Sequence, residues 1–512
     1  MSYHLNLMLL IHRIFYHLDL MPLPFIVFLS TCLMLFLLNI KQKPSQRLPP
    51  GPSKLPLIGN LHQLGDKPHL SLKRLADKHG PLMFLQLGSV PTVVVSSARI
   101  AREMFKTGDH LISARPVQYV PKKITYDCSD IVFGFSGEHR RELKRIAMLE
   151  VLNAKRVQKF GAIRGEEVKS MIDAVAGCWS QVINLSDLAL SLANNVICRV
   201  AYGEEIREKE GDKNRFLQVL QEMQHLLGVF GVADFFPWMG WLNKFNGLDA
   251  KLDKNFNELD KYFDKVLEQH RDLPKREHED KDLVHALLHR QRDPSQAIIL
   301  RNEHIKGLLS DMFIAGSDTA AATIVWIMAE LVRNPTAMKK AQDEVRAVAN
   351  GKPEVLESDL PRLVYMKMVI KEGLRLHPAA PLLIPRETTD TFTVGEYEIP
   401  AKTRLFVNAK AIATDPNSWE DPNEFRPERF MGSSIDFKGH NFEFLPFGFG
   451  RRICPGISFA TVLVELAVAN LLCCFDWSLP EGMRAEDMDM EETVGIVMHK
   501  ETPLCLVASP PS

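Results

Sequence analysis

The sequence lacks an excess of charge of either sign, since its 512 residues include 62 Lys and Arg against 63 Asp and Glu. Proteins that bind nucleic acid usually carry a basic excess, so the composition argues against that class. The eight cysteines form no C-x-x-C pair and no zinc-type spacing, which argues against a zinc site and a disulfide framework. No G-x-S-x-G occurs, and the G-x-G at residues 448–450 lacks the third glycine of a dinucleotide fingerprint. A serine hydrolase and a nucleotide-binding protein therefore have no support.

Repeats, low-complexity tracts and a linker after residue 56 are also missing. Length alone suggests three domains, but without linkers a single large domain is favoured. Apolar residues make up 46% of the chain, which is enough to bury a large core. Helical patterns dominate and strand-like runs are few, so we predict a mainly α fold with small β-sheets. The predicted helices cover residues 302–333, 336–349, 365–376 and 458–474, and the predicted strands cover residues 82–87, 92–95, 392–399 and 404–407.

No downstream stretch looks as apolar as residues 20–40, which carry no charge. Their length matches the roughly 20 residues that span a bilayer as a helix, whereas a signal peptide has an apolar core of about 7–15 residues. More basic residues follow this stretch than precede it, which predicts that the rest of the chain stays in the cytosol. Residues 1–47 are therefore expected to be an N-terminal segment with a single-pass membrane anchor. Residues 1–19 are either a short interfacial segment or precede a translation start at Met21.

Four prolines among residues 48–56 forbid a helix there and favour a stiff, extended connector. Such a connector would hold the globular part in a fixed orientation relative to the membrane. Residues 48–512 are therefore expected to form a cytosolic domain that starts with a proline-rich hinge.

Residues 444–456 read FLPFGFGRRICPG and lead directly into the apolar helix predicted from residue 458. Glycines bracket Cys454, so another group can approach its sulfur closely. Its position before a helix N-terminus, near Arg451 and Arg452, predicts a depressed pKa and a thiolate. A lone cysteine is more often a small buried side chain. The spacing argues against that here, because the pattern F-x-x-G-x-R-x-C-x-G is filled by Phe447, Gly450, Arg452, Cys454 and Gly456.

This loop resembles the haem-thiolate loop of the cytochromes P450. Residues 372–375 resemble the family's E-x-x-R motif, and with FRPERF at residues 425–430 they imply a buried network of Glu372, Arg375 and Arg429. Residues 315–319, AGSDT, are similar to the oxygen-activation motif. The resemblance extends over essentially the whole chain and is strongest to the plant microsomal A-type clan. It implies the cytochrome P450 fold with an N-terminal transmembrane helix.

The AGSDT stretch can also be interpreted from its residues. Gly316 in a helix interior costs about 1 kcal/mol relative to Ala, so the close approach of a planar group would explain it. Thr319 can turn its hydroxyl back to the carbonyl of Ala315, which would open a polar notch for dioxygen and a water. Asp318 would supply protons, so that oxygen leaves as water rather than as hydrogen peroxide. The alternative is that Asp318 and Thr319 only cap a break in the helix.

The resemblance implies haem b as the cofactor, with Cys454 as the axial thiolate ligand of its iron. An anionic sulfur opposite the oxygen favours cleavage of the O–O bond. The resemblance also implies dioxygen as co-substrate and electrons from NADPH through a reductase. Cofactor contacts are expected from Cys454, Arg452, Arg386, Arg140, Lys144, Phe447, Gly448, Ala315 and Gly316.

Three positions depart from the family pattern. Arg140 stands where the family has a tryptophan, so it either binds a haem propionate itself or leaves the haem less firmly held. Ala320 removes one hydroxyl from the proton relay, and Phe449 replaces a smaller residue beside the thiolate loop. The predicted helix that contains Arg140 also carries a basic cluster, made of Arg140, Arg141, Lys144 and Arg145. This cluster is either a solvated face or the docking face for an acidic reductase.

The predicted function is monooxygenation of a lipophilic small molecule, with NADPH-cytochrome P450 reductase as partner, at the endoplasmic reticulum membrane. The segments expected around the substrate are apolar, which favours a plant terpenoid or a similar specialised metabolite. Two alternatives remain: a haem-thiolate isomerase or dehydratase that needs no reductase, and a non-catalytic haem-binding protein. Substrate contacts are expected from residues 117–133, 226–232, 379–384 and 495–497 and from Phe313 and Ala315.

Overall fold

The computed structural model describes Val27, Ser30 and residues 47–203, 210–272, 282–293, 298–493 and 495–511. Its contacts divide the chain into two units, residues 1–48 with 396–398 and residues 49–395 with 399–512. The second unit contains all the described helices from residue 61 onward. The predicted membrane span at residues 20–40 lies outside the described residues, apart from Val27 and Ser30.

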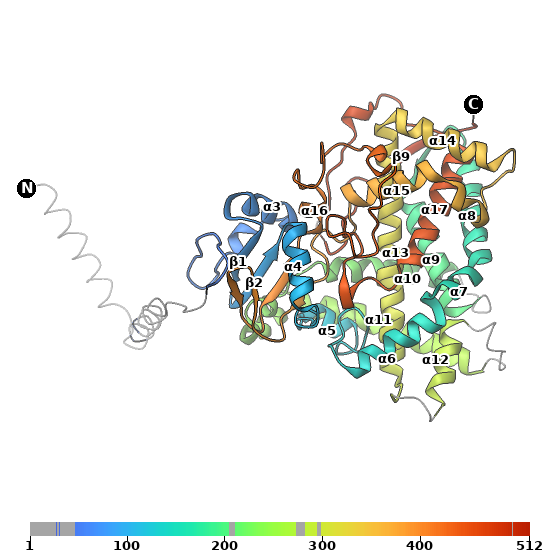
Figure 1. Cartoon of the computed structure of the whole chain (residues 1–512). Coiled ribbons are helices and arrows are strands. Elements are labelled where there is room, and N and C mark those ends of the chain that lie inside the picture. Colours follow the sequence, from blue (N-terminus) through green and yellow to red (C-terminus); the bar gives the residue numbers. More distant parts are fainter. Residues whose placement is uncertain are drawn as a thin grey trace, which may run out of the picture. The chain divides into compact units, whose positions relative to one another are not determined.

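Helices make up most of the described chain, as predicted, and small sheets complete it (Figure 1). The α-helices are α3 (Pro68–His79), α4 (Ala98–Gly108), α5 (Tyr119–Ile124), α6 (Glu138–Ala147), α7 (Ala154–Lys159), α8 (Gly161–Ala176), α9 (Leu185–Tyr202), α10 (Glu210–Leu227), α11 (Leu248–Asp272), α12 (Leu283–Gln291), α13 (Asn302–Arg333), α14 (Pro335–Ala349), α15 (Val364–Leu376), α16 (Ala409–Ala413) and α17 (Ile457–Cys474). The four helices predicted from periodicity are therefore confirmed, with starts shifted by at most one residue.

The principal sheet has the strand order β1-β2-β7-β4. Strands β1 and β2 pair antiparallel, β2 and β7 pair parallel, and β4 and β7 pair antiparallel. A second sheet has the order β3-β9-β8. The strand predicted at residues 392–399 is instead two short strands, because Gly395 between them has a φ of 58°. The strands are β1 (Leu82–Leu87), β2 (Val90–Val95), β3 (Val182–Asn184), β4 (Arg386–Glu387), β5 (Phe392–Val394), β6 (Tyr397–Ile399), β7 (Arg404–Val407), β8 (Asp476–Ser478) and β9 (Cys505–Ser509).

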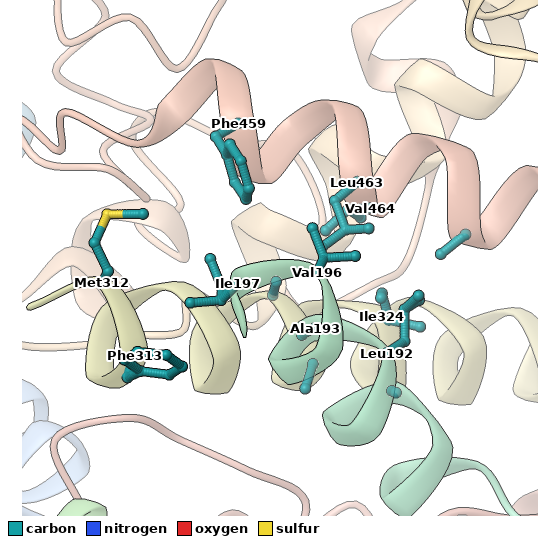
Figure 2. Close-up of a cluster of buried hydrophobic side chains, with 14 of the residues drawn as sticks. Leu192, Ala193, Val196, Ile197, Met312, Phe313, Ile324, Phe459, Leu463 and Val464 are labelled. Atoms are coloured by element: carbon teal, nitrogen blue, oxygen red, sulfur yellow. The ribbon is translucent and has the colours of Figure 1, made fainter. Parts of the chain in front are cut away.

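The long helix α13 runs through the helical part of the molecule, with α9 and α17 packed against it (Figure 1). It ends at Arg333 because Asn334 and Pro335 follow, and Pro335 starts α14 instead. Side chains of all three helices meet in one buried cluster, where Phe459 and Leu463 of α17 approach Ile197 and its neighbours on α9 (Figure 2). The three helices thus form a rigid support on which side chains of α13 can be fixed.

Among the described residues, α13 and α17 are long and apolar enough to cross a membrane. The 18-residue window of α17 has a mean hydropathy of 2.1, in line with its predicted apolar pattern. The most apolar windows of α13 and α17 are 78% and 61% buried, respectively. A helix that is apolar on most faces belongs in the core of a large protein, which is where both lie.

Candidate active site

A cavity lies between α13, α17 and the loop that carries Cys454. Its volume is about 270 Å³, close to the lower end of the about 300–1,000 Å³ of a small-molecule pocket. Most of the predicted site residues line it, namely Ala315, Gly316, Thr319, Arg140, Arg386, Phe447, Gly448, Arg452 and Cys454. Asp318 and Lys144 are not among the residues that line it, and neither is the predicted structural network of Glu372, Arg375 and Arg429.

Backbone geometry holds the loop around Cys454 in place. The Cys454 amide donates to the carbonyl of Phe447 (3.0 Å), and the Gly456 amide donates to the Cys454 sulfur (3.3 Å). Gly450 has a φ of 66°, and a Cβ there would lie 2.2 Å from an oxygen of Asp109. Only glycine fits at this position. The sulfur therefore faces the cavity from a loop with little freedom.

The sequence predicts a depressed pKa for the Cys454 thiol, but the protein by itself raises it. Burial raises the pKa of the Cys454 thiol, although the Gly456 amide and the charge of Lys144 act in the opposite direction. Arg451 and Arg452 were the cations expected beside it, but Lys144 of α6 is the one that acts on it. Desolvation outweighs the helix terminus here, because a charged sulfur without a partner is costly in a dry cavity. A metal ion at this position would supply the missing positive charge.

Thr319 has the predicted local geometry. Its hydroxyl donates to the carbonyl of Ala315 (2.6 Å), and both residues line the cavity. A Cβ at Gly316 would lie 2.7 Å from Ile197 Cδ1, so the contact with α9 also requires a glycine here. Gly316 thus lets α9 pack close to α13. Gly316 lines the cavity as well, and the close approach of a planar group stays a prediction. The helix is continuous through this turn, and Thr319 lies on the cavity side.

Asp318 lies on a different side of α13 from Thr319, as expected for neighbours about 100° apart around a helix. Its carboxylate forms an ion pair with the Nε2 atom of His499 (2.9 Å). The Asp318 side chain is 6% exposed, and the His499 side chain is 37% exposed. His499 was missed from the sequence because no spacing rule connects α13 to a segment near the C-terminus.

Cationic side chains gather at one edge of the cavity. Arg386 donates to the Phe449 carbonyl (2.7 Å), and its Nη1 atom is buried without a hydrogen-bond partner among the described residues. Burial lowers the pKa of Arg386 to about 10, and burial with the charges of Arg140 and Arg386 lowers the pKa of Arg452 to about 9. Arg115, which was missed from the sequence, also lines the cavity, and its pKa falls well below the usual range. Several guanidinium groups therefore share this edge with two carboxylates, since Asp109 lies 3.6 Å from Arg386 Nη1 and Asp311 also lines the cavity.

The predicted basic cluster on α6 is divided between two environments. Arg140 donates through Nε to the Ile131 carbonyl (2.8 Å) and lines the cavity, and Lys144 is half-buried. Arg141 and Arg145 are the exposed members of the cluster, and Arg145 forms an ion pair with Glu142. The cluster is therefore not one solvated face. Phe449, another departure from the family pattern, is fully buried, with the Arg386 guanidinium 4.2 Å from its ring centroid.

The buried network predicted from the E-x-x-R motif is present. Glu372 and Arg375 of α15 are fully buried and form two hydrogen bonds of 2.8 Å, and Arg429 Nε lies 2.9 Å from Glu372. The Arg426 amide also donates to Glu372 (2.9 Å), and Arg375 donates to the carbonyls of Ala413 and Pro422. The network thus ties α15 to the segment that precedes the cysteine loop.

Residues 49–507 match the family described as Cytochrome P450. The chain belongs to the cytochrome P450 family. It resembles strychnine-11-hydroxylase of Strychnos nux-vomica, with 53% identity over 95% of this chain and 97% of the relative. It also resembles cytochrome P450 71A9 of Glycine max, with 54% identity over 94% of this chain and 98% of the relative. The chain is therefore an oxidoreductase of the monooxygenase type, of the plant A-type clan.

The fold agrees with this assignment. A zebra fish cytochrome P450 solved with progesterone superimposes with a TM-score of 0.75 at 26% identity, covering 86% of this chain and 99% of that chain. The cytochrome P450 fold expected from the motifs is thus confirmed.

The cavity of this cytochrome P450 fits the haem-thiolate cofactor that its family implies. The thiol of Cys454, the Arg386 Nη1 atom, which makes no hydrogen bond among the described residues, and the surrounding guanidinium groups match a metal and two carboxylates. Each carboxylate would relieve part of the like-charge repulsion among Arg115, Arg386 and Arg452. The residues of the cavity therefore suit both polar features of haem, its iron and its carboxylates.

The segments expected to contact substrate are only partly brought to the cavity. Residues 131–132, 379–380 and 383–384 line it, together with Ala315. Phe313 instead packs in an aromatic cluster with Tyr202 and Phe216, with ring centroids 5.2 and 5.1 Å away. Residues 226–232 and 495–497 are not among the lining residues but meet each other, since a Cβ at Gly228 would lie 2.9 Å from the Gly495 Cα.

Proposed function

We propose that this cytochrome P450 inserts one oxygen atom of dioxygen into a lipophilic plant metabolite, using electrons from NADPH through a reductase. The observation that carries the proposal is the cavity in which Cys454, the Thr319 hydroxyl and a mostly apolar wall lie together. When bound through Cys454, haem supplies the oxygen chemistry. Insertion of one oxygen atom releases the other as water, so the balance needs two electrons and two protons per turnover.

The residues around the cavity have separate tasks in this proposal. Cys454 is the metal ligand, and Arg386, Arg452 and Arg140 neutralise the carboxylates of the cofactor. Phe447, Gly448, Ala315 and Gly316 shape the space around it. Thr319 holds a proton at its Oγ1 atom beside the reacting oxygen, and Asp318 is the acid behind it. Lys144 acts on Cys454 by its charge, and Glu372, Arg375 and Arg429 stabilise the fold beneath the loop.

The placement in the cell rests on the sequence pattern. We propose that residues 1–47 contain a single membrane anchor, and that residues 48–512 form the catalytic domain on the cytosolic side of the endoplasmic reticulum. The span at residues 20–40 and the basic residues after it support this orientation. Fractionation of a fusion with a glycosylation acceptor at either end tests it, because only an end in the lumen is modified.

The substrate class remains within specialised metabolism. The apolar lining favours a terpenoid, whereas the relative named strychnine-11-hydroxylase adds alkaloids to the candidates. We propose to test microsomes and reductase against a panel of both classes, with strychnine included. Substrate-dependent NADPH consumption with an oxygenated product supports the proposal, and turnover without reductase or dioxygen would instead indicate an isomerase or dehydratase.

Replacing Thr319 with alanine is expected to uncouple the reaction. Product formation should fall by about tenfold or more, since a positioned proton donor contributes about 10²–10⁴-fold, while hydrogen peroxide release per NADPH rises. Peroxide and product are both measured against NADPH consumed. Thr319→Ser should retain most of the coupling because it keeps the hydroxyl. Thr323→Ala is the matched control, since Thr323 makes the same back-bond to the Thr319 carbonyl (2.8 Å); equal uncoupling in both alanine variants would contradict the role of Thr319.

Replacing Arg386 with leucine is expected to weaken haem retention. A hydrogen bond to a charged group contributes about 1.5–3 kcal/mol, so haem loss to an acceptor protein should accelerate about tenfold or more. The rate of haem loss from Arg386→Lys should lie between those of Arg386→Leu and the parent. Arg102→Leu is the control, because Arg102 is a cation near an aromatic ring, that of Phe442, at a half-exposed position. Unchanged haem loss in Arg386→Leu would show that the other guanidinium groups suffice.

A further inference from the structure

The ion pair between Asp318 and His499 connects the interior of α13 with solvent. Asp318 is nearly buried, whereas more than a third of the His499 side chain is exposed. The Nε2 atom of His499 lies 2.9 Å from a carboxylate oxygen of Asp318. One side of the pair thus belongs to the helix that carries Thr319, and the other side belongs to the surface.

The segment that carries His499 is hydrogen-bonded to α13 and to Ala379 of the cavity wall. The Met498 amide donates to the carbonyl of Ala379, and the indole Nε1 of Trp326 on α13 donates to the Met498 carbonyl, each at 2.9 Å. The Thr493 amide donates to the His499 carbonyl (2.9 Å), and the His499 amide donates to Thr493 Oγ1 (3.2 Å). These bonds fix the backbone at His499 relative to α13, so the pair is not a chance contact of two mobile side chains.

A buried acid that delivers protons must be supplied again before the next turnover. Asp318 is too enclosed to exchange readily with bulk water, and the atom beside it is an imidazole nitrogen. Imidazole is suited to this task because it accepts a proton at one nitrogen and donates from the other near neutral pH. The exposed part of His499 provides the contact with water.

We propose that His499 is a positioning residue for this reaction, which holds the Asp318 carboxylate and returns protons to it from solvent. The proposal rests on the function proposed above. A proton from water binds the ring at Nδ1, and the proton at Nε2 passes to the Asp318 carboxylate. Asp318 passes its proton toward the Thr319 side of α13 and is again a carboxylate. The ring returns to its first tautomer by exchange with water, so no proton is gained or lost by the protein over a cycle.

Three substitutions separate transfer from packing. His499→Gln keeps a hydrogen-bond donor of similar reach but cannot pass a proton through two nitrogens, and His499→Ala removes both. His289→Gln is the control, because His289 is an exposed histidine on α12. Full-length enzyme in phosphatidylcholine vesicles with reductase is used, with the compound from the panel above that gives the largest substrate-dependent NADPH consumption as probe.

Both His499 variants are expected to release at least threefold more hydrogen peroxide per NADPH than the parent, with a larger solvent deuterium effect on product formation. In Asp318→Asn, a further His499→Ala change should add nothing, since the histidine acts through the carboxylate. His499→Gln that couples as well as the parent would overturn the proposal and leave a packing role. A parent enzyme without substrate-dependent NADPH consumption would instead refute the proposed function itself.

A second measurement does not depend on turnover. In protein with ¹⁵N-labelled histidine rings, the ring signal that disappears in His499→Gln belongs to His499. In the parent, that signal should show an Nε2–H proton that is protected from exchange with water, because the Asp318 carboxylate holds this proton. In Asp318→Asn, the protection should be lost. A signal that is the same in the parent and in Asp318→Asn would show that the pair does not form in solution.

Discussion

Cys454→Ala is expected to abolish the red-shifted Soret band of the reduced carbon-monoxide complex and all product formation. Among the described residues, Cys454 has the one thiol that lines the cavity, so the substitution removes the thiolate donor. The measurement is a difference spectrum of the reduced protein with carbon monoxide, normalised to haem content. The loss should be complete rather than graded, because alanine offers the metal no donor atom.

A control separates this loss from a failure to fold. Cys178→Ala removes another free cysteine, at a half-buried position outside the cavity, and should leave the spectrum unchanged. Cys454→Ser keeps the size of the side chain and should fold, as judged by circular dichroism, yet lack the red-shifted band. A band retained in Cys454→Ala would mean that a different residue binds the metal.

Local motifs in the sequence predicted nine of the residues that line the cavity. The pattern around Cys454, the AGSDT stretch and the E-x-x-R motif each lie within a few residues of one element, so their geometry follows from helix and turn rules. The hydroxyl of Thr319 bonds back to Ala315 for this reason. The long helices α13 and α17 were also predictable, since their apolar patterns extend over many residues.

Interactions between distant segments could not be predicted in this way. The raised pKa of Cys454 depends on burial by distant segments, which no local pattern reports, and the contact of Gly316 with Ile197 depends on how α9 crosses α13. His499 meets Asp318 only because the C-terminal segment folds back along α13. Arg115 is a single cation in an otherwise uncharged stretch, a weak signal that could have been followed.

Glu372→Gln is expected to cause a large loss of stability. Glu372 is fully buried and accepts from Arg375, Arg429 and the Arg426 amide, so its neutral replacement leaves two guanidinium groups without a countercharge. Breaking a buried ion pair by removing one partner costs about 3–5 kcal/mol, a large part of the stability of a typical domain. We expect a strongly reduced yield of holoprotein and a lower midpoint of thermal unfolding. The damage should reach the cysteine loop, because the segment that holds Arg429 leads into it.

An exposed pair with the same spacing provides the matched control. Arg484 and Asp487 are also three residues apart and form an ion pair with a distance of 2.8 Å, but both side chains are more than half exposed. Asp487→Asn should therefore leave the unfolding midpoint close to that of the parent, since water compensates an exposed charge. If Glu372→Gln lowers the midpoint no more than Asp487→Asn does, the network does not stabilise the fold. Glu372→Asp, which keeps the charge but shortens the side chain, should fall between them, because attraction at a longer distance still offsets part of the burial of Arg375.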